Sequence, residues 1–286
     1  MVTPFASSGA VDYDVASKLA KFLVAEGSDG LVVAGSTGEG SSLSDEEKLD
    51  LFSCVAQAVN VPVLAGSTSS DTARSVALTS QVAATGVAGV LATTPAYARP
   101  SQSGIAAHMG ALAQCTALPV MIYDIPSRTG RKIASATTID LVRKYANVVA
   151  LKDASADLVS AAHTKAVLAG ELDLYSGDDG LLLPFMAIGA VGIVSVAAHW
   201  AGAEFAGIVR SVHDGDWTQA RVLNERVGPS CAFESTEEYP NPVPSKAAMR
   251  SLGFAVGQCR LPHGPAGEAL DRAAADIIAM LRGARG

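Results

Sequence analysis

Short apolar runs separated by stretches of helical periodicity are the feature that most constrains the fold of this chain. The runs recur at intervals of about thirty residues, and each is aliphatic or β-branched. Such runs are typical of parallel strands that are buried on both faces. We expect eight strands, at Met1–Phe5, Gly30–Gly35, Val61–Gly66, Val87–Thr94, Leu118–Asp124, Asn147–Asp153, Leu172–Ser176 and Val191–Val196.

The stretches between the runs have the spacing of amphipathic helices. Ser44 followed by Glu47 is the signature of a capping box at a helix start. Helices are expected over Val11–Glu26, Ser44–Val59, Asp71–Thr85, Ser101–Cys115, Ser135–Tyr145, Ser155–Ala169 and Ala201–Val212. Eight strands alternating with helices predict an α/β fold, a (βα)8 TIM barrel. A doubly wound open sheet is the alternative, but it usually has fewer strands, and no G-x-G-x-x-G follows the first run.

The pattern changes after the eighth helix. Three further helices are expected, over Asp216–Val227, Ser245–Leu252 and Ala266–Arg282, with no strand between them. We therefore predict a TIM barrel catalytic domain over residues 1–213 and a C-terminal helical extension over residues 214–286.

Composition excludes several classes of function. The net charge is −7 and no Lys/Arg-rich run exists, so nucleic acid is not an expected partner. The four cysteines and five histidines form no metal-ligand spacing, and we expect neither a metal nor another cofactor. With no run long enough to cross a membrane and no secretory leader, the chain is expected in the cytoplasm.

Lys152 stands near the end of the sixth apolar run, where barrels place catalytic groups. Alternation puts Val148, Ala150 and Lys152 on one face of the strand. A buried ammonium is costly unless it is neutralised or paired, and burial lowers the pKa of a lysine. Lys152 is therefore a candidate imine-forming nucleophile. A solvated lysine beyond the strand end is the alternative.

The fifth run ends with Tyr123, and Arg128 follows after a proline. A phenol at the barrel mouth can move protons to and from a carbonyl adduct. A guanidinium can bind a carboxylate through two hydrogen bonds. The alternatives are a core tyrosine with its hydroxyl paired and a surface arginine.

The second run ends in the turn G-S-T-G-E, residues 35–39, which presents the hydroxyls of Ser36 and Thr37. Hydroxyls and backbone N–H groups at a strand-to-helix turn suit a bound carboxylate. The alternative is that the glycines are needed only for the backbone of a tight turn. The fourth run is followed by a second phenol, that of Tyr97.

Three segments occur in a distinctive order: G-S-T-G-E at 35–39, Y-D-I-P-S-R-T-G at 123–130 and A-L-K-D at 150–153. With S-G-D-D at 176–179 and N-P-V-P-S-K at 241–246, they resemble the dihydrodipicolinate synthase/N-acetylneuraminate lyase family. The resemblance runs from Val2 to the C-terminal helices. It implies a TIM barrel and pyruvate-dependent class I aldolase chemistry without a metal.

The resemblance also implies a role for each site residue. Lys152 looks like the Schiff-base lysine, Tyr123 like a proton-shuttling phenol linked to the Thr37 hydroxyl, and Tyr97 like a relay phenol that crosses a tight-dimer interface. Ser36 and Thr37 look like ligands of the pyruvate carboxylate. Further matches are Arg128, for the carboxylate of the second substrate, and Arg99, Gly177 and Ile193, which line or support the site.

Arg128 favours the synthases of the family over the sialic acid lyases, which lack an arginine there. The implied reaction condenses pyruvate with L-aspartate 4-semialdehyde, begins the diaminopimelate route to lysine and is carried out by a homotetramer, a dimer of tight dimers. One alternative is a related aldolase acting on a 2-keto-3-deoxy sugar acid or a hydroxy-oxoglutarate. Another is a non-catalytic sensor of a keto acid.

Several positions depart from the family pattern. Ser36 stands where the synthases commonly have threonine, although the hydroxyl is kept. Relatives inhibited by lysine carry histidine, asparagine, glutamate and tyrosine where this chain has Lys48, Ser70, Arg74 and Ala96. An arginine in place of a glutamate repels the ammonium of lysine, so little feedback inhibition is expected. Only Met1–Phe5 stand where relatives have a longer first strand, and we expect the natural start to lie upstream.

Overall fold

The computed structural model describes residues 1–283, which form a parallel sheet whose seven strands follow one another in chain order. The strands are β1 (Leu31–Val33), β2 (Val63–Ala65), β3 (Gly89–Thr93), β4 (Val120–Asp124), β5 (Val148–Asp153), β6 (Asp173–Ser176) and β7 (Gly192–Ile193). Helices connect them, as in the predicted TIM-barrel-like α/β fold. The chain divides into two compact units, one of Met1–Val63 with the segment from Val196 onward, the other of Leu64–Ser195.

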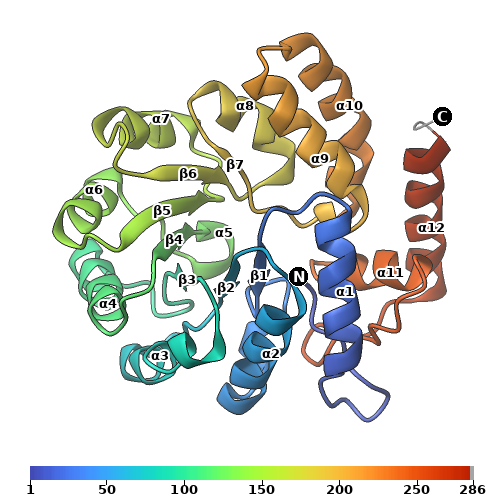
Figure 1. The fold of residues 1–286 in the computed structure, drawn as a ribbon, viewed down its shortest axis with the longest axis horizontal. Helices are drawn as coiled ribbons and strands as arrows, with labels where there is room; N and C mark the ends of the chain where they lie inside the picture. The colour runs from blue at the N-terminus through green and yellow to red at the C-terminus, as the bar shows by residue number, and fades with distance from the viewer. Residues whose placement is uncertain (284–286) are drawn as a thin grey trace. The chain divides into compact units, whose positions relative to one another are not determined.

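The second unit, Leu64–Ser195, contains most of the sheet. Its helices are α3 (Thr72–Thr79), α4 (Gln102–Gln114), α5 (Pro126–Thr129), α6 (Ser135–Lys144), α7 (Leu158–Val167) and α8 (Leu182–Ala187), with short 3-10 turns at Val82–Thr85 and Asp179–Leu181. Figure 1 shows α3, α4, α6 and α7 on the outer side of the strands. Every residue of β4 is buried, because helices cover the sheet and neighbouring side chains fill its other face.

Local capping explains where several of these helices begin. Asp71, Ser101 and Asp157 each accept a hydrogen bond from the backbone N–H three residues later, at the starts of α3, α4 and α7. Such a bond satisfies one of the N–H groups that a helix start leaves unpaired. The caps therefore fix where the three helices begin, after the loops 66–71, 94–101 and 154–157.

The first unit contains β1 and the remaining helices: α1 (Tyr13–Ala25), α2 (Asp45–Ala58), α9 (Ala198–His213), α10 (Trp217–Phe233), α11 (Val243–Ser251) and α12 (Glu268–Gly283), with a 3-10 turn at Gly40–Ser42. Helix α1 packs on α2, α9 on α10 and α11 on α12. The predicted capping box is confirmed, since Ser44 and Glu47 exchange side-chain and backbone hydrogen bonds at the start of α2.

The prediction of a strand over Met1–Phe5 is wrong. The segment is buried, but its backbone N–H groups bond to scattered partners: Val2 donates to His199 Nε2 (3.0 Å) and Phe5 donates to the carbonyl of Val256 (3.1 Å). Its one β-type contact is an antiparallel bridge between Phe5 and Val11. An apolar run can be buried without a strand ladder, and periodicity does not distinguish the two cases.

The helices also differ from the predictions in length and in number. The helix expected over Asp71–Thr85 ends at Thr79, and a separate 3-10 turn follows it. Helix α10 continues beyond Val227 to Phe233, with Pro229 accommodated inside it. Helix α8 has no counterpart among the predictions, because its run of apolar residues lacks the polar face that reveals an amphipathic helix.

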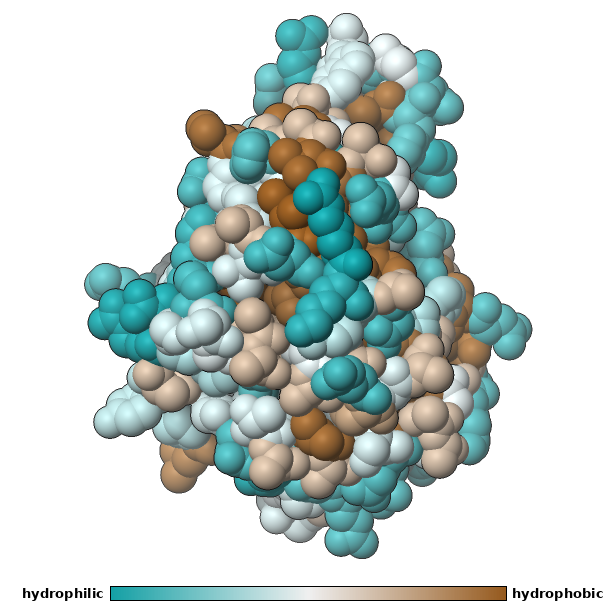
Figure 2. Space-filling model, turned by 90° about the vertical axis from the view of Figure 1, so that its left-hand side faces the viewer, coloured by the Kyte–Doolittle hydropathy of each residue, from teal (hydrophilic) through white to brown (hydrophobic). Residues whose placement is uncertain are grey.

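Hydrophilic and hydrophobic residues are intermixed on the molecular face drawn in Figure 2, with the hydrophobic atoms confined to limited areas. Such mixing is ordinary for the outer faces of helices exposed to water. Among the helices of residues 1–283, none combines the length and the apolar character that crossing a bilayer requires.

Candidate active site

Lys152 lies at the end of β5 and is 8% exposed. Its strand neighbour in the sheet is Tyr123 of β4, and the Lys152 Nζ lies over the Tyr123 ring, 4.1 Å from the ring centroid. A cation above an aromatic face is stabilised by the ring quadrupole. The structure therefore brings together the amine and the phenol that the sequence singled out.

Gly177 makes room for the Lys152 side chain. A Cβ added at Gly177 would lie 2.9 Å from the Ala154 Cβ and 3.0 Å from the Lys152 Cγ. The Gly177 N–H also donates to the carbonyl of Asp153 at 2.7 Å, which continues the sheet pairing past the strand end. Any larger residue here displaces either the lysine or the neighbouring strand. Ile193 pairs with Ser176, the residue before Gly177, so it lies at the same edge of the sheet.

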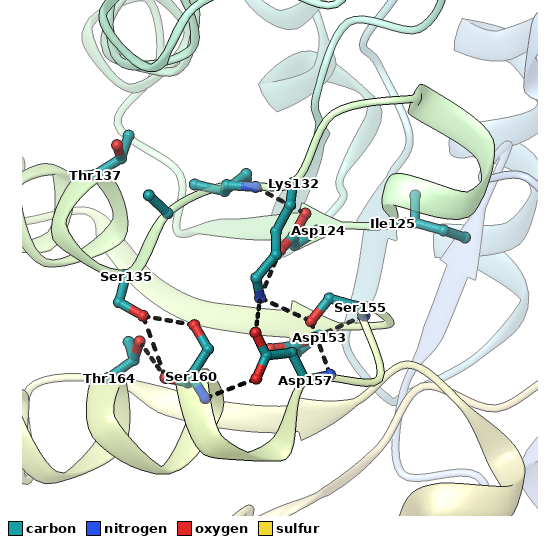
Figure 3. A network of polar contacts seen from close by, with 12 residues as sticks. Asp124, Ile125, Lys132, Ser135, Thr137, Asp153, Ser155, Asp157, Ser160 and Thr164 are labelled. Carbon is teal, nitrogen blue, oxygen red and sulfur yellow. Dashed lines mark hydrogen bonds and ion pairs between the residues drawn. The ribbon is translucent and has the colours of Figure 1, made fainter.

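Asp124 follows Tyr123 in β4 and is 3% exposed. Burial raises the pKa of its carboxyl from 3.8 to about 7, and the charge of Asp153 adds to the rise. The Ile133 N–H, which donates to Asp124 Oδ1 at 3.1 Å, acts in the opposite direction, as does the charge of Lys132. Figure 3 shows this carboxyl beside the Lys132 side chain.

Lys132 connects this carboxyl to the start of α7. Its Nζ lies 4.0 Å from Asp124 Oδ2 and 3.3 Å from Asp157 Oδ2, and it donates to Ser155 Oγ at 3.0 Å (Figure 3). The segment between β4 and α6 is thus anchored at Ile133 and Lys132. Arg128 lies within that segment on the short helix α5, with an exposed side chain.

Tyr97 is 97% exposed, so within this chain its ring packs against almost nothing. It lies in the loop between β3 and α4 with a backbone φ of 68°, and Arg99 in the same loop has a φ of 46°. Non-glycine residues adopt such left-handed conformations only when their surroundings impose them. Arg131 supports the loop, since its Nη2 donates to the Arg99 carbonyl at 3.2 Å. The structure does not bring Tyr97 into contact with Lys152.

Ser36 and Thr37 belong to the first unit, in the turn after β1. Two glycines that follow them are required by close backbone approaches. A Cβ at Gly38 would lie 2.9 Å from the Ala34 nitrogen, and one at Gly40 would lie 2.0 Å from the Ala34 carbonyl oxygen. The turn is therefore compact, and its two hydroxyls project from a fixed backbone.

Asn241 contacts this turn through a hydrogen bond that the sequence did not reveal. Its Nδ2 donates to Thr37 Oγ1 at 2.8 Å, and its Oδ1 accepts from the Ser245 hydroxyl at 3.0 Å. Both residues belong to the N-P-V-P-S-K segment, which carried part of the family resemblance without a role for either. The Asn241 and Ser245 side chains are functional candidates that the sequence analysis missed.

Glu39 closes the same turn with a buried ion pair. Its Oε1 lies 2.7 Å from Lys246 Nζ, with both side chains at most 1% exposed. Its Oε2 accepts from the backbone N–H of Arg260 at 2.8 Å. Burial lowers the pKa of Lys246, and the charge of Glu39 opposes that shift. The pair fixes the turn to the segment around α11.

Within residues 1–283, no group of three or more His, Cys, Asp and Glu side chains is arranged to hold a metal ion. The chemistry that these residues can perform is that of an amine, a phenol, hydroxyls and a guanidinium. An amine beside a phenol suits imine formation with a carbonyl compound.

Comparison with known proteins finds relatives that share one enzyme name. A 4-hydroxy-tetrahydrodipicolinate synthase of Desulforamulus reducens is 42% identical over 264 residues, 92% of this chain and 88% of the relative. The corresponding enzyme of Bacillus subtilis is 41% identical over 267 residues, 93% of this chain and 91% of its own length.

Solved structures that resemble this chain carry the name dihydrodipicolinate synthase. Dihydrodipicolinate synthase from Cyanidioschyzon merolae, crystallised with lysine bound, matches with a TM-score of 0.95 and 37% identity, covering 99% of this chain and 96% of that one. The model of the dihydrodipicolinate synthetase family matches residues 1–280. The chain therefore belongs to the dihydrodipicolinate synthetase family.

Proposed function

We propose that this chain catalyses the reaction of the 4-hydroxy-tetrahydrodipicolinate synthases, a lyase-class condensation of pyruvate with L-aspartate 4-semialdehyde that begins lysine biosynthesis through diaminopimelate. The observation that carries the proposal is the buried Lys152 amine over the Tyr123 ring at the end of β5. The relatives that share more than 40% identity with the chain bear the name of this activity.

The proposed chemistry begins at the Lys152 nitrogen. The neutral amine adds to the C2 carbonyl of pyruvate, and loss of water gives an iminium ion linked to the lysine. Loss of a methyl proton gives an enamine, whose carbon attacks the aldehyde carbon of the second substrate. Cyclisation by the amino group of that substrate then displaces the lysine. In this scheme, Tyr123 accepts and returns protons at the Lys152 nitrogen and at the oxygen of the C2 carbonyl.

The two substrates bring carboxylates that need separate partners. The Ser36 and Thr37 hydroxyls are the proposed partners of the pyruvate carboxylate. Arg128, on the segment anchored by Lys132 and Ile133, is the proposed partner of the carboxylate of aspartate semialdehyde. Arg99, Gly177 and Ile193 are proposed to line or support the site. A solved relative from Acinetobacter baumannii, 29% identical with a TM-score of 0.93, was crystallised with pyruvate.

A second copy of the chain is part of the proposal. Tyr97 is held in a left-handed conformation yet is 97% exposed, which suits a side chain that enters the site of a partner subunit. There it is proposed to relay protons to Tyr123, whose hydroxyl is linked to that of Thr37 in the proposed site. The proposed assembly is a homotetramer built as a dimer of such tight dimers.

The location of the enzyme in the cell and its division into domains are two further proposals. None of the four cysteines Cys54, Cys115, Cys231 and Cys259 forms a disulfide in the described part of the chain, which suits the reducing cytoplasm. The division into a barrel over residues 1–213 and an extension over residues 214–286 stays a prediction. It can be tested by limited proteolysis, which should cut first near the predicted boundary.

A coupled assay tests the proposed substrate pair. Purified protein is supplied with pyruvate and aspartate semialdehyde, and product is consumed by a dihydrodipicolinate reductase while NADPH oxidation is followed. Steady NADPH consumption that requires both substrates supports the proposal. Absence of turnover, together with pyruvate release from a 2-keto-3-deoxy sugar acid or a hydroxy-oxoglutarate, would instead identify a related aldolase.

A further inference from the structure

The Thr37 hydroxyl has a defined direction. Its oxygen lies 2.8 Å from the Asn241 side-chain nitrogen. An amide nitrogen can donate a hydrogen bond but cannot accept one, so the Thr37 oxygen must be the acceptor. The hydroxyl proton then remains available for a second, electron-rich partner. The contact with Asn241 thus makes Thr37 a donor toward any ligand of the turn.

Ser245 contacts the opposite end of the Asn241 amide, while the amide nitrogen faces Thr37. The Ser245 hydroxyl donates to Asn241 Oδ1 at 3.0 Å, and the two side chains are nearly inaccessible, with Asn241 5% exposed and Ser245 fully buried. A reversed amide would place its oxygen against Thr37, where it would accept the hydroxyl proton. With the amide in this orientation, the hydrogen bonds from Ser245 through Asn241 to Thr37 all run in one direction.

The position of the turn does not depend on this chain alone. Glu39 is held separately by Lys246 Nζ and by the backbone N–H of Arg260. The glycines at 38 and 40 also hold the backbone of the turn against Ala34. A change at Asn241 should therefore redirect the Thr37 hydroxyl while the turn stays in place.

We propose that Asn241 and Ser245 are positioning residues that aim the Thr37 proton at the carboxylate of the bound keto acid. This inference rests on the proposed function and extends it by assigning a role in substrate recognition to the segment that leads into α11. A hydroxyl aimed in advance binds the anion without first giving up another hydrogen bond.

Kinetics of four variants test the inference. In Asn241→Asp, a carboxylate accepts the Thr37 proton and adds a negative charge, so the KM for pyruvate is expected to rise roughly ten-fold or more. The KM for aspartate semialdehyde should stay within about two-fold. Asn241→Ala and Ser245→Ala should raise the pyruvate KM by smaller factors, because they remove the orientation without reversing it. Thr37→Val should remove the donor itself.

Coupling between sites separates positioning from a purely structural role. If Asn241 acts through Thr37, adding Asn241→Ala to Thr37→Val should change the pyruvate KM little further. Asn147→Asp is the matched control. The Asn147 Nδ2 is likewise a hydrogen-bond donor, but its acceptors are the backbone carbonyls of Ala113, Thr116 and Leu118, far along the chain from the turn. This control should lower thermal stability and leave the pyruvate KM unchanged.

The outcomes are distinguishable from failure of the proposed function. Pyruvate concentration-dependent trapping by borohydride in the unaltered protein tests imine formation independently of Asn241. If trapping occurs but Asn241→Asp and Ser245→Ala leave its half-saturating pyruvate concentration unchanged, the inference is overturned and the function stands. If Asn241→Ala changes the pyruvate KM by the same factor in the unaltered protein and in the Thr37→Val variant, the inference is overturned as well. If Asn241→Asp does not fold, as judged by circular dichroism, Ser245→Ala and the double variant decide.

Discussion

The Lys152 Nζ lies over the face of the Tyr123 ring, 4.1 Å from its centroid, and the two residues are paired in register on neighbouring strands. Parallel strands bring the amine and the phenol to the same edge of the sheet, where barrel enzymes place their active sites. In the proposed mechanism, this proximity lets one phenol serve each proton transfer of the imine. The pair is therefore the first target for mutation.

Tyr123→Phe keeps the ring beneath the Lys152 Nζ but removes the hydroxyl. Turnover should fall by roughly 10²-fold to 10⁴-fold, the usual contribution of general acid–base catalysis. Trapping of pyruvate at Lys152 should persist, although more slowly. Steady-state rates and mass spectrometry after borohydride treatment measure the two effects. Turnover equal to that of the unaltered protein would exclude Tyr123 as the proton carrier.

Gly177→Ala should impair catalysis by displacing Lys152. The new methyl group would lie 2.9 Å from the Ala154 Cβ and 3.0 Å from the Lys152 Cγ, closer than such atoms approach. We expect kcat to fall by about ten-fold or more, since small displacements of a reacting group are costly. Gly228→Ala in α10 is the control, because nothing lies within 4 Å of the added Cβ and alanine favours the helix. Normal kcat in Gly177→Ala would show that the close contact is harmless.

Asp124→Asn should stabilise the protein increasingly as the pH rises. The folded-state pKa of about 7 lies above the ordinary 3.8, so the folded protein holds this proton more tightly than the unfolded chain. The stability that proton binding contributes is complete below pH 4 and is lost as the pH rises through 7. Asparagine does not titrate and can still accept from the Ile133 N–H.

The comparison is made by denaturant unfolding of both proteins at several pH values. The advantage of Asp124→Asn should grow by up to about 3 kcal/mol between pH 5 and pH 8. A pH-independent difference would show that the carboxyl titrates near its ordinary value. Asp157→Asn is a useful control, because the Ser160 N–H and Lys132 lower the pKa of this exposed carboxyl instead.

Lysine should inhibit this enzyme little. Arg74 stands on the exposed side of α3, at the position where the family resemblance implies a glutamate in lysine-inhibited relatives, and its cation should repel the ammonium of lysine. The coupled assay with increasing L-lysine measures the effect, with the Cyanidioschyzon merolae relative, which was crystallised with lysine bound, assayed in parallel for comparison. Strong inhibition at sub-millimolar lysine would contradict the prediction.

Strand alternation predicted that Lys152 and Tyr123 lie at the same end of the barrel, and the family resemblance was needed to assign their roles. Lys152 and Tyr123 each end an apolar run, and period-two alternation together with parallel pairing places them at one edge. The same reasoning failed for Met1–Phe5, because an apolar run records burial and not its hydrogen-bond partners. Those partners are a histidine ring and a loop carbonyl far along the chain.

Local sequence patterns could not predict the contact of Asn241 with Thr37. Its contact with Thr37 joins residues 204 positions apart, and nothing in the spacing of either segment indicates it. The raised pKa of Asp124 is similar, since it depends on burial and on charges from β5 and α7. Tertiary hydrogen bonds and desolvation are properties of the folded chain, so sequence reasoning finds the reacting groups more readily than the residues that position them.

Borohydride reduction in the presence of pyruvate tests the central claim most directly. Peptide mapping by mass spectrometry should find one reduced pyruvate adduct per chain, attached to Lys152, and Lys152→Ala should acquire none. An unmodified Lys152 in folded protein at saturating pyruvate, or an adduct on a different lysine, would contradict the account.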